Sequence, residues 1–400
     1  MNTSSSSIRA LLVGLAFLGV GAVAHAQGTP GPVRIGALLP LTGQGSANGI
    51  AQLAGLRMAA TEINAAGGIL RRQVEIVVAD EQSDPTSAVT EAKRLAFQDK
   101  VDAIWGPPIS QEVLAVLPVF TEAKLLQLTT AGSALLTPQS GPYHFALLPS
   151  IDAQGVAMVN FVSTSLRSKA PAILADNGGQ SKTGVAAMLA RAKELNLPIV
   201  AQQEFSFRTN DMTPQLLALR RVNADALLVM VSIPDDLAAI LRGIKDLGWD
   251  VRVVGGQAVG AYSGAVGKDL GSDVFEKVAG QSLPGYTYCS TDKLGDSEYA
   301  RWMVKFKTVS PDVARTAPLP IASYGYGGLY IFKAIMEATG TTDGPTNAAW
   351  IEKNAASIPN FLGKFSASPS THFLLGPDSL PMLDHPERFR EDGLQKRAGC

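Results

Sequence analysis

Two short runs of small and hydroxylated residues form a candidate binding site for a small anion. They span Gly106 to Ser110 and Thr129 to Ser133, and each follows a short apolar stretch typical of a buried strand. In an open α/β sheet, ligands bind outside the carboxyl ends of the strands, where backbone N–H groups and helix N-termini face the same space. The two runs therefore predict an anion site at the end of a parallel sheet.

The elements that must position these runs alternate along almost the whole chain. The pattern of Val33 to Leu39 predicts a buried parallel strand, and the helical pattern from Gly49 to Ala66 ends at Gly67-Gly68. A second series of strands and helices begins after Pro149. Such alternation is typical of parallel sheets covered by helices on both faces.

A third segment, from about Leu283, is mostly helical and lacks a strand series of its own, so we expect it to return to the first domain. The remaining expected strands are Val74 to Ala79, Ala103 to Trp105, Leu125 to Leu128, Ala172 to Ala175, Ile199 to Glu204, Ala226 to Val231 and Val251 to Val254. The remaining expected helices are Pro85 to Phe97 (capped by Asp84), Ser110 to Ala123, Lys182 to Leu195, Pro214 to Val222, Asp235 to Leu247, Ser297 to Thr308, Ile321 to Ala338 and Asn347 to Ala356.

The first residues have the layout of a secretory signal peptide. Arg9 precedes an apolar run from Ala10 to Ala24, and Ala24-His25-Ala26 supplies the small-x-small cleavage site. We expect cleavage after Ala26 and a mature chain that begins near Gln27. No cysteine lies at this site to carry a lipid anchor. The sequence therefore predicts an exported protein, free in the periplasm and not inserted in the membrane.

Composition narrows the class of protein. The 400 residues are 46% hydrophobic and 17% charged, which is enough apolar material for two domains. A formal net charge of −1 provides no basic field for nucleic acid. Cys289 and Cys400 could form one bridge or remain free thiols. The histidines are scattered without the spacing of a zinc site, and we expect neither a metal nor a cofactor.

Four motifs in order resemble those of periplasmic solute-binding proteins of ABC transporters, of the branched-chain amino acid (leucine/isoleucine/valine) type. They are Arg34 to Gly43 (RIGALLPLTG), Ile63 to Ile69 (INAAGGI), Asp80 to Pro85, and Gly106-Pro107 with Ser110. The resemblance covers nearly the whole mature chain. It implies a small-molecule ligand, a membrane permease as partner, a monomeric state and no catalysis.

The resemblance also implies the fold and its domain limits. The fold is α/β, with two doubly wound parallel-sheet lobes joined by a three-strand hinge, the type I periplasmic binding fold. Lobe 1 would comprise residues 33–148 plus 283–362, and lobe 2 residues 149–282 plus 363–400. The crossovers would fall near residues 147–150, 281–284 and 361–364, and ligand would be trapped when the lobes close.

Family members hold the ligand's carboxylate with hydroxyl and N–H groups at positions that match Ser110 and Ala131-Gly132-Ser133. The amine side departs from the family, because Gln257 stands where an acidic residue usually pairs with the ammonium. Three pocket positions also lack the common tyrosine: Asn48, Gln180 and Ser232. A polar pocket makes leucine or valine doubtful. Asp176, Asp235 or Asp236 could still serve an amine, so amino acids and related organic or aromatic acids both remain candidates.

Several alternatives use the same residues. Gly43 to Gly49 approximates a dinucleotide fingerprint with poor spacing, and a mobile ligand-facing loop or a plain loop fits better. Ser110 could be only a helix N-cap and Ser133 only a turn residue. Tyr324 to Tyr330 favours lobe packing over a pocket wall. A sensor that feeds a signalling receptor is the alternative to a transporter component, and an exported enzyme is disfavoured because no Gly-x-Ser-x-Gly elbow occurs.

Overall fold

The fold is described from a computed structural model that covers residues 1–2, 31–206, 208–316 and 319–400. Residues 32–400 form one compact unit. The predicted signal peptide falls almost entirely outside the described residues. Within the described part of the chain, no helix is both long and apolar enough to cross a membrane.

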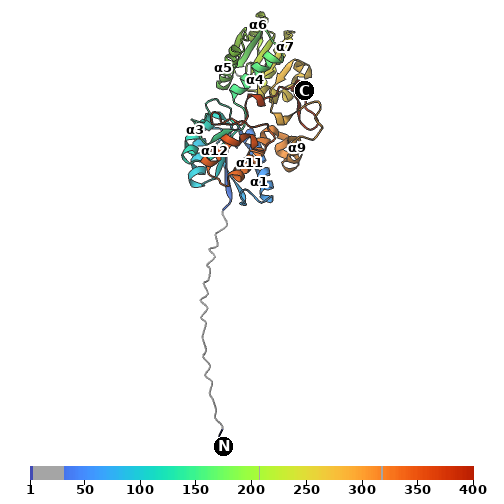
Figure 1. Cartoon of the computed structure of the whole chain (residues 1–400). Coiled ribbons are helices and arrows are strands. Elements are labelled where there is room, and N and C mark those ends of the chain that lie inside the picture. The colour runs from blue at the N-terminus through green and yellow to red at the C-terminus, as the bar shows by residue number, and fades with distance from the viewer. Residues whose placement is uncertain (3–30, 207, 317–318) are drawn as a thin grey trace. The chain divides into compact units, whose positions relative to one another are not determined.

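Two five-stranded sheets, each wholly parallel, organise the chain (Figure 1). The first has the order β2-β1-β3-β4-β5 and the second the order β10-β9-β8-β6-β7. The first contains β1 (Val33–Leu39), β2 (Val74–Asp80), β3 (Ala103–Trp105), β4 (Leu126–Thr129) and β5 (His144–Ala146). The second contains β6 (Pro171–Asp176), β7 (Gln202–Phe205), β8 (Ala226–Met230), β9 (Arg252–Gly255) and β10 (Val278–Gly280).

Each sheet is buried on both faces, as the continuous apolar strands predict. In β1, Ile35 and Ala37 belong to one core cluster, while Leu38 belongs to the cluster on the opposite face. In β8, Leu227 and Leu228 divide in the same way between two further clusters. Successive side chains of a strand point to opposite faces, so helices must cover both.

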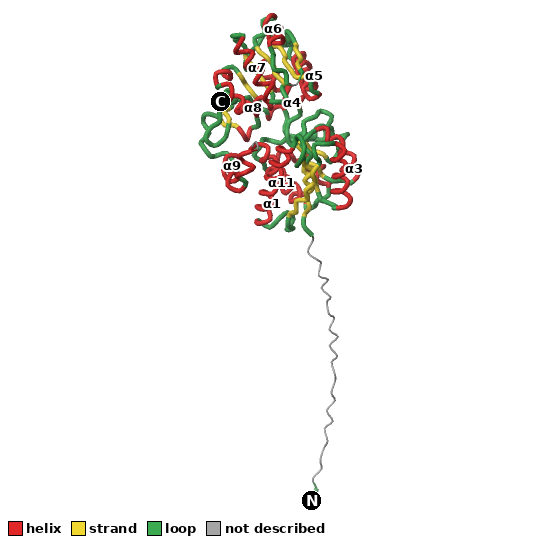
Figure 2. Tube along the Cα trace, turned by 180° about the vertical axis from the view of Figure 1, so that it is seen from behind, coloured by secondary structure: helices red, strands yellow, loops and turns green. Residues whose placement is uncertain are grey.

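The helices fall into two sets, one for each sheet, and Figure 2 shows them around the strands. Lobe 1, the first sheet with its helices, has α1 (Ser46–Ala65), α2 (Pro85–Lys93), α3 (Ser110–Glu122), α9 (Glu298–Val309), α10 (Pro311–Thr316), α11 (Leu319–Thr339) and α12 (Gly344–Asn354). Lobe 2, the second sheet with its helices, has α4 (Ile151–Thr164), α5 (Gly179–Glu194), α6 (Thr213–Arg221), α7 (Pro234–Asp246) and α8 (Gln257–Leu270).

Local sequence signals explain several helix ends. Asp84 caps α2 by accepting from the Ser87 N–H, and Pro85 follows as the first helical residue. Gly67 and Gly68, after α1, have positive φ values of 104° and 85°. The helix expected to reach Phe97 instead continues as a π-helical turn, Arg94–Gln98. The sequence analysis missed the three-residue strands β5 and β10 and the 14-residue helices α4 and α8.

The third segment returns to lobe 1, as predicted. Helix α11 packs beside α1, and its buried Leu329, Phe332 and Ile335 join the core of the first sheet. Further along, Phe365 and Leu374 also lie in this core, whereas Met382 lies in a core of lobe 2. The limits of the lobes stay a proposal, and this packing favours placing residues 365–380 with lobe 1 rather than lobe 2.

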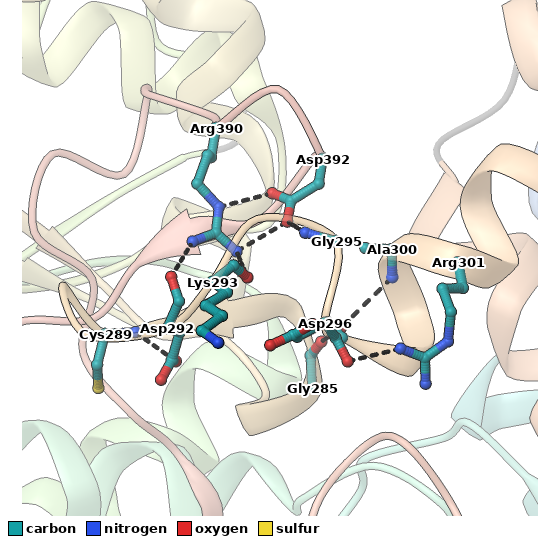
Figure 3. Close-up of polar contacts among 11 residues, drawn as sticks. Gly285, Cys289, Asp292, Lys293, Gly295, Asp296, Ala300, Arg301, Arg390 and Asp392 are labelled. Atoms are coloured by element: carbon teal, nitrogen blue, oxygen red, sulfur yellow. Dashed lines mark hydrogen bonds and ion pairs between the residues drawn. The ribbon is translucent and has the colours of Figure 1, made fainter.

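The end of the chain is fastened by a disulfide and a short parallel ladder. Cys289 and Cys400 form the disulfide, and β12 (Gln395–Lys396) pairs with β11 (Thr287–Tyr288). Figure 3 shows the polar contacts beside it, in which the Arg390 guanidinium lies 2.7 Å from the Asp392 carboxylate. The sequence left open whether the two cysteines form a bridge or remain free thiols, and the structure contains the bridge.

Candidate functional site

The structure brings the two serines of the predicted anion site together. The backbone N–H of Ser133 donates to Ser110 Oγ over 3.2 Å, although the residues are 23 positions apart. Ser110 is the first residue of α3 and Ile109 is the N-cap, so the Ser110 hydroxyl is not a simple helix cap. The Ser110 hydroxyl therefore lies at the N-terminus of α3, the end of a helix whose dipole favours negative charge.

Buried hydrogen bonds hold the loops that carry these serines. The Gln127 amide donates to the Gly106 carbonyl over 2.9 Å, and Thr129 Oγ1 lies 2.9 Å from His144 Nε2. Burial, reinforced by the charge of His372, lowers the pKa of His144 to about 3, so its ring is neutral at physiological pH. The Gly132 carbonyl accepts from the Ile151 N–H at the start of α4. The loop that carries Ser133 is therefore supported from both sides.

Three of the other predicted residues, Gln180, Ser232 and Gln257, line one cavity of about 200 Å³. It lies in lobe 2, beyond the carboxyl end of β8, where α4, α5 and α8 begin. The Gln180 amide also lies 3.5 Å from Ser110 Oγ, at the limit of a hydrogen bond. That contact joins the cavity to the serine pair of lobe 1.

A glutamine bracket, Gln154 with Gln257 and Gln281, shapes one wall of this cavity. Gln154 Oε1 accepts from the Gln257 N–H over 3.1 Å, and its Nε2 donates to Gln257 Oε1 over 3.3 Å. The Gln281 amide donates to the Gln154 carbonyl over 2.8 Å. Gly256 leaves room for the bracket, since a Cβ there would lie 3.0 Å from Gln154 Oε1. Neither Gln154 nor Gln281 carries a sequence signal.

Ser232 and Tyr262 also line the cavity, and a buried carboxylate lies behind the Ser232 hydroxyl. Ser232 Oγ donates to Asp176 Oδ2 over 2.9 Å, and the Tyr262 hydroxyl donates to the Ser232 carbonyl over 3.0 Å. Asp176 is 1% exposed and does not line the cavity. Asp236, a second buried acid, has a raised pKa because of its burial and, among charges, the proximity of Asp176. Sequence analysis did not anticipate Tyr262 at this site.

Asn48 is not brought to this cavity. Its Oδ1 accepts from the Gln52 amide, whose Oε1 in turn accepts from the buried Trp105 indole N–H over 2.8 Å. A ligand-binding role for Asn48 therefore stays a prediction without a contact to the other residues. In the described part of the chain, no three His, Cys, Asp or Glu side chains cluster as a metal site would require.

The chain folds into two parallel α/β lobes. A polar cavity lies at the strand ends of lobe 2, and the serine pair of lobe 1 lies beside that cavity. This arrangement is typical of a solute-binding protein. A family model described as periplasmic binding protein matches residues 32–377, and the chain belongs to that family. It is of type I, the branched-chain amino acid type. These relatives are substrate-binding proteins and not enzymes, in agreement with the predicted lack of catalysis.

Individual relatives are distant in sequence. The Leu/Ile/Val-binding protein BraC3 of Rhizobium johnstonii is 23% identical over 353 residues, which is 88% of this chain and 90% of that protein. An amino acid binding protein of Pseudomonas aeruginosa is 25% identical over 228 residues, which is 57% of this chain and only 61% of that protein.

Solved structures share the fold at low identity. LivJ of Streptococcus pneumoniae in complex with isoleucine has a TM-score of 0.70 at 21% identity, with 91% of this chain and 97% of that chain covered. A solute-binding protein of Rhodopseudomonas palustris in complex with 4-hydroxybenzoate has a TM-score of 0.71 at 17% identity, with 91% and 95% covered. Both similarities concern the fold alone.

Proposed function

We propose that this chain is the substrate-binding component of an ABC uptake transporter and that it captures a small carboxylate between its lobes. The observation that carries the proposal is the contact of Gln180 with Ser110, at 3.5 Å, which joins the lobe 2 cavity to the serine pair. Donors on lobe 1 would bind the acid first, and lobe 2 would then close over the rest of the ligand.

The polarity of the site supports an acidic ligand. The Ser110 hydroxyl and the N-terminus of α3 meet the Ala131–Ser133 loop, and α4, α5 and α8 begin at the cavity. All these groups present N–H or O–H dipoles that stabilise negative charge. The ligands of the two compared structures, isoleucine and 4-hydroxybenzoate, differ in their side groups but share a carboxylate. An amino acid or an aromatic acid therefore fits the same proposal.

The family and the sequence together support a proposal for the cellular compartment and for the partner of this chain. A signal peptide over residues 1–26 would export the chain to the periplasm. There it would deliver its ligand to a membrane permease as a monomer. Co-purification of the mature chain with a candidate ABC permease from the same organism, in the presence of ligand, would test that partnership.

Titration calorimetry of serine variants tests the carboxylate site. Ser110→Ala and Ser133→Ala should each weaken binding of the best acid found in a thermal-shift screen, by about 1 to 3 kcal/mol, because each removes a hydrogen bond to a charged group. Ser357→Ala is a suitable control, since Ser357 is exposed beyond α12 and its hydroxyl donates to the Asn354 carbonyl. Unchanged affinity in both site variants would contradict the proposed site.

A further inference from the structure

The Ser232 hydroxyl donates its only hydrogen bond within the protein. It donates to Asp176 Oδ2 over 2.9 Å, so the Ser232 oxygen is left only with its capacity to accept. Asp176 is held in place, because its other oxygen accepts from the Gly178 N–H over 2.9 Å. Since Ser232 lines the cavity, its oxygen faces a ligand as a hydrogen-bond acceptor.

The Tyr262 hydroxyl is committed in the same way. It donates to the Ser232 backbone carbonyl over 3.0 Å, and a carbonyl also can only accept. Burial raises the pKa of Tyr262 above its usual value, so the phenol keeps this proton. Tyr262 also lines the cavity. The Ser232 and Tyr262 hydroxyl oxygens therefore form a wall of acceptors, the acceptor wall.

No charged side chain among the described residues lines this cavity. The Asp176 carboxylate is 1% exposed, and Ser232 lies between it and the cavity. An ammonium group placed against the acceptor wall would lose water without gaining an ionic partner in contact, which is costly. A neutral donor loses far less and satisfies the same two oxygens.

We propose that the ligand carries a neutral hydrogen-bond donor, a hydroxyl or an amide N–H, at the part that meets Ser232 and Tyr262. This inference rests on the proposed function, which supplies the carboxylate at the other part of the ligand. Together they define the ligand class as a hydroxylated or amide-bearing acid. A purely apolar acid would leave both oxygens unpaired.

Matched acids that differ in one group test the inference. Calorimetry would compare 4-hydroxybenzoate with 4-fluorobenzoate, and 5-hydroxypentanoate with pentanoate and 5-aminopentanoate. We expect the hydroxylated member of at least one series to bind roughly tenfold to a hundredfold more tightly than its partner without a donor. The aminopentanoate should bind more weakly than the hydroxypentanoate, since its donor is charged.

Variants of Ser232 and Tyr262 test whether the preference for a hydroxylated acid comes from the acceptor wall. Ser232→Ala and Tyr262→Phe should each reduce the preference for the hydroxylated acid over the matched acid without a donor about tenfold. The reduction should come chiefly from weaker binding of the hydroxylated acid. The matched control is Ser263→Ala on α8, the helix that carries Tyr262. The Ser263 hydroxyl donates to the Val259 carbonyl, and Ser263 does not line the cavity. Circular dichroism and the melting temperature report whether each variant is folded.

The outcomes separate this inference from the proposed function. If acids bind through Ser110 and Ser133 but neither hydroxylated acid is preferred, or if both wall variants keep the preference, the acceptor wall is overturned and the proposed function stands. Tighter binding of 5-aminopentanoate than of 5-hydroxypentanoate would overturn the inference that the donor is neutral. If no acid binds, the proposed function fails and the inference fails with it. When a variant does not fold, the comparison of matched acids on the wild-type chain decides.

Discussion

At the scale of single residues, two buried carboxyl groups lie near the start of α3, and no cationic side chain among the described residues forms an ion pair with either. Glu81 is fully buried and Glu112 is 3% exposed. Burial, with a further contribution from the Glu112 charge, raises the pKa of Glu81 to about 7. Burial likewise raises the pKa of Glu112. The native state thus holds a proton on Glu81 that the unfolded chain releases at lower pH.

This difference predicts a stability that falls as the pH rises. Because the native pKa of Glu81 is above the unfolded value of 4.5, its contribution is complete below pH 4.5 and is lost as the pH rises through about 7. Glu81→Gln should match the wild type near pH 5 and exceed its free energy of unfolding by about 1 to 3 kcal/mol at pH 8. Urea unfolding at both pH values measures this.

The exposed Glu122, the last residue of α3, provides the control for that experiment, since Glu122→Gln removes a carboxylate that is not buried. Equal pH slopes for the wild type and Glu81→Gln would contradict the assignment. The buried His144 acts in the opposite direction, because its lowered pKa destabilises the native state only as the pH falls below about 6.5.

At the scale of elements, the aromatic-rich stretch of α11 packs closely because of its glycines. A Cβ at Gly325 would lie 2.0 Å from the Gln52 carbonyl of α1, and a Cβ at Gly328 would lie 2.0 Å from the Trp105 ring of β3. Gly55 of α1 meets the Ala322 carbonyl at a similar 1.9 Å. These contacts agree with the prediction of lobe packing for this helix.

Alanine substitutions on α11 should therefore have opposite effects. Gly328→Ala must displace the buried Trp105 and should destabilise the fold by about 1 to 3 kcal/mol. Gly327→Ala is the matched control, since its Cβ would lie 3.7 Å from Phe361, an ordinary contact, and alanine favours a helix by up to about 1 kcal/mol. Chemical denaturation of both variants measures the difference, and similar free energies would contradict this account of the packing.

At the scale of the whole molecule, the chain's last residues fasten to a loop far back in the sequence. The Cys289–Cys400 disulfide spans 111 positions. Beside it, the Arg390 guanidinium donates to the Asp292 carbonyl over 2.9 Å and lies 4.0 Å from the centre of the Tyr288 ring (Figure 3 shows the Arg390 contacts with Asp292 and Asp392). The noncovalent contacts can hold the native arrangement, while the disulfide mainly restricts the unfolded chain.

Removal of the disulfide should therefore lower stability more than it changes binding. For a loop of this length, Cys289→Ser with Cys400→Ser should lower the free energy of unfolding by about 2 to 5 kcal/mol. Ligand affinity should remain within about twofold, because neither cysteine lies at the cavity. Thermal unfolding of the wild type with and without reductant is the parallel measurement. An unchanged melting temperature in both tests would show that the bridge contributes nothing.

Much of the fold could be predicted because its signals are local. Ala226–Met230 is apolar throughout and Val33–Leu39 is apolar except for Arg34, as expected of strands that are buried on both faces. The hydroxylated runs after β3 and β4 were visible for the same reason, since each run directly follows its strand. The strand β5 was missed because its three residues begin with a histidine and form no apolar run, whereas the equally short β3 is apolar throughout.

The sequence by itself determined the alternation of strands and helices, the family and the presence of serines at strand ends. Only the tertiary structure decided which distant side chains meet. Gln154 and Gln257 are 103 positions apart, and Asp176 and Ser232 are 56 apart, yet both pairs are hydrogen-bonded at the cavity. Periodicity reports the burial of one element at a time, whereas such partnerships depend on how whole helices and sheets pack against one another.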